Sequence, residues 1–135
     1  MHRHFSTTVT VFLASTALAL ADAASDARSI LAQSGVKGGF IVHVGSGDGK
    51  LTAALKATES YQVHGLDANA DRVRAAREAI LKAGAYGPVS VDTWNGRDLP
   101  YIEGSVNLVV VDDGAKVAPG EIERVLTPLG VAMVK

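Results

Sequence analysis

Short apolar runs alternate with amphipathic stretches along most of this chain. Nearly continuous apolar runs occupy residues 40–44 and 106–111, as expected for strands buried on both faces of a sheet. Three further strands are predicted at 61–66, 89–93 and 131–134. The hydrophobic pattern therefore predicts five strands.

Helical periodicity fills the segments between these runs. The clearest helix is predicted over 70–83, where Val73, Ala76 and Ile80 form an apolar stripe and Asn69 can cap the first turn. Shorter helices are predicted over 25–34, 50–57 and 119–126. The charged side chains of the long helix are expected to stay in water: Arg72, Arg74, Arg77, Glu78 and Lys82.

The order of these elements predicts an α/β domain. Strands that alternate with helices form a parallel sheet, and right-handed crossovers place the helices on both of its faces. We therefore expect a doubly wound, mostly parallel Rossmann-like sheet that is truncated after the fifth strand. In such a sheet a ligand binds beyond the carboxyl ends of the strands, where the strand order reverses.

The N-terminal residues differ from the rest of the chain. A weakly basic start is followed by an uncharged apolar run at 9–20 and by small residues at Ala19, Ala21 and Ala23. This layout is typical of a bacterial secretory signal peptide, and the run is too short for a stable membrane span. We predict a signal peptide at 1–23 and a globular domain at 24–135. The chain is then exported to the periplasm or secreted, with a cytoplasmic location as the alternative.

Composition narrows the chemistry of the domain. The 135 residues are 47% apolar and 20% charged, which is ordinary for one soluble domain. The chain has no cysteine, so disulfides, thiolate metal sites and cysteine nucleophiles are excluded, and its histidines show no metal-binding spacing. We therefore expect no metal site. The net charge is −1 without any block of like charge, so no nucleic-acid partner is expected either.

A glycine-rich loop follows the first buried strand. Residues 42–52 read V-H-V-G-S-G-D-G-K-L-T. A nucleotide-binding P-loop would have glycine where Val44 stands and a hydroxyl where Leu51 stands, and a dinucleotide loop would have glycine at Lys50. The pattern that remains is G-x-G-x-G, with an acid, Asp67, closing the second strand. This pairing predicts a small-molecule site.

Four segments, in order, resemble class I S-adenosylmethionine-dependent methyltransferases of the methyltransferase type 11-like kind. They read F-I-V-H-V-G-S-G-D-G, V-H-G-L-D, N-G-R-D-L-P-Y-I-E-G-S-V-N-L-V-V and R-V-L-T-P-L-G-V-A-M-V. The resemblance implies S-adenosylmethionine as the cofactor, and methyl transfer to an unidentified acceptor as the activity. It gives no catalytic residue, because methyl transfer to a good nucleophile mainly requires alignment.

The same resemblance implies the residues that hold the cofactor. Asp67 would bind both ribose hydroxyls, the glycine loop would approach the amino-acid portion, and Asn95 with Gly96 would meet the adenine. Trp94 would cover the ring or pack in the core. Asp112 and Asp113 lie where some relatives place a base or metal ligand, although a plain strand-end loop is the more common case. The implied cofactor-binding set is His43, Gly45, Ser46, Gly47, Gly49, Asp67, Ala68, Asn95, Gly96 and Asp112.

Two positions depart from the family pattern. His43 stands where the family usually has an acid that helps to hold the cofactor's ammonium group. A neutral imidazole can still accept one hydrogen bond there, and a core histidine with satisfied partners is the other interpretation. Asn107 replaces a common aspartate of the fourth strand.

The chain also resembles the methyltransferase-like segment that precedes a quinoprotein-type β-propeller in some exported bacterial proteins. Members of the methyltransferase family usually carry two strands beyond the fifth, so we expect a further C-terminal domain or a partner to cover the open sheet edge. An exported, catalytically degenerate binding or scaffold domain is therefore the alternative function. An NAD-dependent oxidoreductase is a third possibility, which Lys50 disfavours.

Overall fold

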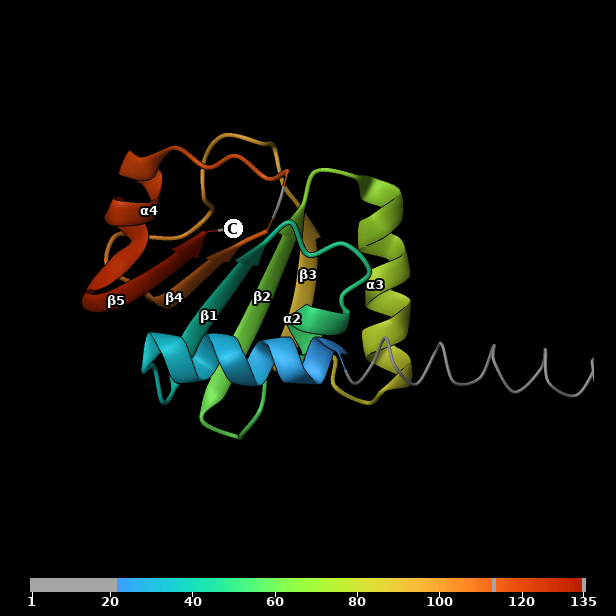
Figure 1. Ribbon diagram of the computed structural model, residues 1–135. Helices are drawn as coiled ribbons and strands as arrows, with labels where there is room; N and C mark the ends of the chain where they lie inside the picture. Colours follow the sequence, from blue (N-terminus) through green and yellow to red (C-terminus); the bar gives the residue numbers. More distant parts are fainter. Residues whose placement is uncertain (1–21, 113, 135) are drawn as a thin grey trace, which may run out of the picture.

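The computed structural model describes residues 22–112 and 114–134. Within these residues, five strands form one parallel sheet in the order β3-β2-β1-β4-β5 (Figure 1). The strand order reverses at β1, so the sheet is doubly wound, as predicted. Most of the predicted signal peptide, residues 1–21, lies outside the described residues. The strands are β1 (Gly39–Val44), β2 (Tyr61–Asp67), β3 (Val89–Thr93), β4 (Val106–Val111) and β5 (Leu126–Val134).

Helices cover both faces of the sheet (Figure 1). A helix over 22–34, α2 (Lys50–Ala54) and α3 (Ala70–Lys82) pack on one face, and α4 (Pro119–Val125) packs on the other. The first helix already includes residue 22, three residues before its predicted start, and α2 ends three residues before its predicted end. In the described part of the chain, no helix has both the length and the apolar character needed to cross a membrane.

The core consists of two apolar layers, one on each face of the sheet. Ile41 and Leu108 point into the layer beneath α2 and α3, whereas Val42 and Val109 point into the layer beneath α4. All four side chains are fully buried. Because β1 and β4 contribute to both layers, their sequences are continuously apolar rather than alternating.

The fifth strand begins earlier than predicted. We expected it at residue 131, but β5 starts at Leu126, directly after α4. Leu126 pairs with Val106 and Val131 pairs with Leu108, so the register shifts between these two pairs. The T-P-L-G sequence of residues 127–130 is typical of a turn, and only the pairing of Leu126 with β4 extends the strand across it.

The outer edge of β3 is covered by charged groups. Arg77 of α3, which we expected in water, donates from Nε to the carbonyl oxygen of Val91 at 2.8 Å and from Nη2 to Asp92 at 2.6 Å. His64 Nε2 lies 2.7 Å from the same carboxylate, and its Nδ1 lies 2.5 Å from the hydroxyl of Tyr101. The hydrogen bond to His64 and the nearby Arg77 hold the pKa of Asp92 below its ordinary value.

Two residues of α4 hold the long connection between β3 and β4. Glu121 accepts from the backbone N–H of Leu99 at 2.8 Å and from Nε of Arg124 at 2.7 Å. Arg124 also donates to the carbonyl oxygens of Leu99 and Tyr101, at 2.9 and 2.8 Å. The Arg124 and Leu99 donors lower the pKa of Glu121 to about 2. This network holds the connection between β3 and β4 against α4.

Replacing Glu121 with Gln should lower the free energy of unfolding at neutral pH, and the difference should shrink in acid. The folded-state pKa of about 2 lies below the ordinary value of 4.5, so the stabilisation is complete above that ordinary value and is lost as the pH falls toward 2. Urea unfolding of the wild type and E121Q, in steps from pH 7 to pH 3, measures this. Glu123→Gln, an exposed position on the same helix, is the matched control. A difference that is the same at every pH would contradict the assignment.

Candidate functional site

A cavity of about 520 Å³ lies at the carboxyl ends of the strands. This volume is within the range of about 300–1,000 Å³ that is common for small-molecule sites. Its lining comes from the connections that follow β1, β2, β3 and β4, together with one side chain of α3. The lining residues are Gly45, Gly47, Asp67, Ala68, Arg72, Trp94, Gly96, Gly114, Ala115 and Lys116.

Half of the ten residues in the predicted cofactor-binding set line this cavity. They are Gly45, Gly47, Asp67, Ala68 and Gly96.

The other five are not among the residues that line the cavity: His43, Ser46, Gly49, Asn95 and Asp112. Asn95, for example, shapes its own loop, because its side-chain oxygen accepts from the backbone N–H groups of Arg97 and Asp98. Trp94 both lines the cavity and packs in the core, so its two interpretations hold together.

Asp67 is a buried carboxylate with three hydrogen-bond donors. The backbone N–H of Gly47 lies 3.0 Å from Oδ2, and the backbone N–H of Asn69 lies 2.9 Å from Oδ1. Arg72 Nε donates to Oδ1 at 3.1 Å. Burial raises the pKa of Asp67, but the two backbone donors and Arg72 together hold it below its ordinary value of 3.8. Asp67 is therefore ionised at neutral pH and acts only as an acceptor.

Arg72 stays exposed to water, as predicted, but it also contacts Asp67, which the sequence did not predict. The side chain is 58% exposed, yet its guanidinium lies on the carboxylate and lines the cavity. Asn69 caps α3 by accepting from the backbone N–H groups of Asp71 and Arg72, so the helix begins at Ala70, shortly after Asp67. An arginine in the first turn of such a helix can fold back on the acid. The spacing of five residues between Asp67 and Arg72 is therefore the feature of the sequence that indicates this contact.

The three glycines of the loop after β1 have different surroundings. A Cβ at Gly49 would lie 2.9 Å from the Cβ of Ala76, so this glycine allows close packing against α3. A Cβ at Gly45 would lie 3.2 Å from the Cβ of Ala115. A Cβ at Gly47 would meet nothing within 4 Å, because this glycine faces the cavity. Only the middle glycine therefore keeps open space next to it.

Replacing Gly49 with Ala should destabilise the fold more than replacing Gly47 with Ala. Both residues have a positive φ, 80° and 55°, so each substitution costs about 1–2 kcal/mol of backbone strain. Gly49→Ala adds overpacking against Ala76, which costs about 1–3 kcal/mol more. Urea unfolding of both variants measures the difference. Equal losses would mean that α3 moves away without cost.

His43 is a core residue with both ring nitrogens engaged, as in the second interpretation of the sequence. The residue is 1% exposed, with Nδ1 at 2.8 Å from Oγ1 of Thr52 and Nε2 at 2.9 Å from Oδ2 of Asp112. Because a carboxylate only accepts, Nε2 of His43 donates to Asp112, and Nδ1 pairs with the hydroxyl of Thr52. His43 thus connects β1 with α2 and with the end of β4.

Replacing Thr52 with Val should cost about 1–3 kcal/mol, because it leaves a buried ring nitrogen without its partner. Ser46→Ala is the matched control. The Ser46 hydroxyl is also buried, but it has no hydrogen-bond partner among the described residues. Its removal should leave the stability unchanged or slightly higher. Denaturant unfolding of both variants tests this, and an unchanged midpoint for T52V would argue against the His43 network.

Comparisons with known proteins agree with this geometry. The sequence matches the profile described as a methyltransferase domain over residues 41–130. A comparison with curated proteins gives no match.

Solved structures share the fold. A protein of Methanococcus maripaludis assigned as an S-adenosyl-L-methionine-dependent methyltransferase has a TM-score of 0.72 and 21% identity, over 80% of this chain and 52% of its own. The Streptomyces coelicolor geranyl diphosphate C-methyltransferase, solved with S-adenosyl-L-homocysteine, has a TM-score of 0.73 and 17% identity. The match covers 82% of the present chain and 44% of that protein. A SAM-dependent methyltransferase of Aquifex aeolicus has a TM-score of 0.66 and 21% identity, and the match covers 81% of the present chain and 62% of that protein.

The present chain spans about half the length of the first two of these proteins. At such identities the likeness shows a common Rossmann-like fold. The family profile covers most of the chain, from β1 to the first half of β5. The chain therefore belongs to the methyltransferase domain family.

Proposed function

We propose that the cavity binds S-adenosylmethionine and that the domain contributes the cofactor site of a methyltransferase. One observation carries this proposal: the ionised carboxylate of Asp67 and the open backbone of Gly47 line the same cavity at the strand ends. The family membership makes methyl transfer the chemistry that this cavity would serve. The methyl acceptor is not identified.

The residues present fit such a cofactor. Asp67 can accept hydrogen bonds from ribose hydroxyls, which charge strengthens. Gly47 and Gly96 have no atoms within 4 Å of the place where a Cβ would stand, so the ligand can approach their backbone. Trp94 supplies a flat apolar wall for the adenine, and its Nε1 is fixed by a 2.7 Å hydrogen bond to the carbonyl oxygen of Asp98.

Binding and alignment are the tasks left to the protein. The bound cofactor would supply a methyl group bonded to a sulfonium sulfur. On transfer of the methyl group, the sulfur would keep the bonding electrons and become a neutral thioether. The chain's residues then orient the cofactor and keep the cavity walls fixed, and this alignment accounts for much of the rate enhancement. His43 and Thr52 belong to the supporting structure, since their hydrogen bonds run to each other and to Asp112.

The alternative function, an exported and catalytically degenerate binding or scaffold domain, uses the same cavity. It differs only in turnover, so binding alone does not separate it from an active enzyme. Robust methylation by the full-length protein would exclude it. Export itself and a quinoprotein-like context stay predictions, because they depend on residues outside the described part of the chain.

Calorimetry with S-adenosylhomocysteine and S-adenosylmethionine tests the proposed binding. The wild type should bind both, and Asp67→Asn should weaken binding about tenfold or more, since it removes a charged acceptor of ribose hydroxyls. Asp71→Asn is the control, because that carboxylate is 84% exposed and its ion pair among the described residues is with Arg74. Circular dichroism first establishes that each variant is folded. No binding to the folded wild type at millimolar concentration would refute the proposal.

A further inference from the structure

We propose that Arg72 competes with the ribose for Asp67 and thereby sets the affinity of the cavity for its ligand. The inference rests on the proposed function and adds a residue that the family resemblance did not indicate. Arg72 differs from the other charged side chains of α3 because it alone among them lines the cavity. Its role is therefore in ligand affinity and not in catalysis.

The acceptor capacity of Asp67 is nearly filled by protein donors. A carboxylate offers about four lone-pair positions, two on each oxygen. Oδ1 accepts from the backbone N–H of Asn69 at 2.9 Å and from Arg72 Nε at 3.1 Å, so both of its positions are in use. Oδ2 accepts from the backbone N–H of Gly47 at 3.0 Å and keeps one position. A ribose brings two adjacent hydroxyls, so it needs one position more than is left.

Arg72 is the donor that can leave. The N–H groups of Gly47 and Asn69 belong to the backbone, one in the glycine loop and the other in the N-cap residue of α3. The Arg72 donor lies on a long, rotatable side chain that is 58% exposed. A half-exposed ion pair is weak, so moving the guanidinium costs little compared with breaking the loop.

The exchange also explains how the buried charge of Asp67 is stabilised before a ligand binds. Asp67 is 4% exposed, and without Arg72 its Oδ1 would keep only one donor. Arg72 thus satisfies the carboxylate until the ribose takes its place. The cost of this arrangement is a lower ligand affinity, because each binding event first breaks the ion pair.

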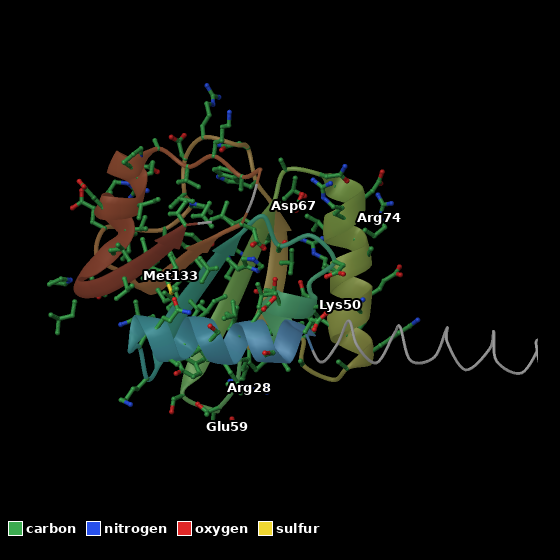
Figure 2. The ribbon with its side chains drawn as sticks, viewed as in Figure 1. Arg28, Lys50, Glu59, Asp67, Arg74 and Met133 are labelled. Atoms are coloured by element: carbon green, nitrogen blue, oxygen red, sulfur yellow. The ribbon has the colours of Figure 1, made fainter. Side chains whose placement is uncertain are left out.

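Removing Arg72 should therefore tighten binding. Calorimetry with S-adenosylhomocysteine should give a dissociation constant about three- to tenfold lower for Arg72→Ala than for the wild type, the range expected for a weak, half-exposed pair. Arg74→Ala is the matched control. It removes the same charge from the same helix, but Arg74 pairs with Asp71 and lies on the far side of α3 from Asp67 (Figure 2). Its affinity should stay within about twofold of the wild type.

Salt concentration provides a second readout. Screening weakens the pair of Arg72 with Asp67, so the ratio between wild type and R72A should fall as the salt rises from about 0.05 to 0.5 M. A ratio that does not change with salt would overturn the inference, as would equal or weaker binding by R72A. Arg72→Met, which keeps an unbranched side chain but has no hydrogen-bond donor, replaces R72A if the alanine variant does not fold.

The two proposals fail in different ways. If the folded wild type and R72A both show no binding at millimolar concentration, the proposed function and the inference fall together. If the wild type binds and R72A binds no better, only the inference falls. Binding by R72A but not by the wild type would support both.

Discussion

The carboxylate of Asp67 is the interaction around which the site is arranged. An isolated buried charge would cost many kcal/mol, and only hydrogen bonds to it make such burial tolerable. Its donors come from the loop after β1 and from the start of α3, two connections that neighbour each other because β1 pairs with β2. The acid therefore fixes the distance between the glycine loop and α3, and the cavity lies between them and the connections after β3 and β4.

A second polar contact works in parallel on the other side of β1. His43 connects Thr52 of α2 with Asp112 at the end of β4. The apolar layers on both faces set the positions of the strands, but they do not determine where the connections at the strand ends go. The positions of these connections are set by polar side chains near or at the carboxyl ends of the strands. Substituting these residues should disturb the site more than similar changes on the surface of α3.

The sequence predicted those features that depend on local chemistry. The five strands, their alternation with helices and the Asn69 cap follow from patterns within a few residues, whereas the sequence left two interpretations open for His43. The contacts of Arg72 and Arg77, the close approach of Gly49 to Ala76 and the early start of β5 did not follow. Each of them depends on a partner brought near by the fold, and a charged residue on an amphipathic helix has the same appearance whether it is solvated or paired.

The contact between Arg77 and β3 has a consequence for how the sheet can grow. An outer strand usually offers backbone groups on which a foreign strand can pair. At β3 the carbonyl oxygen of Val91 is already taken by a guanidinium, and the carboxylate of Asp92 lies beside it. A strand added there would have to displace one charge and bury another. On the opposite edge β5 presents Leu129, which is 92% exposed. Pairing of an added strand is therefore disfavoured beside β3, where it would disturb these charges.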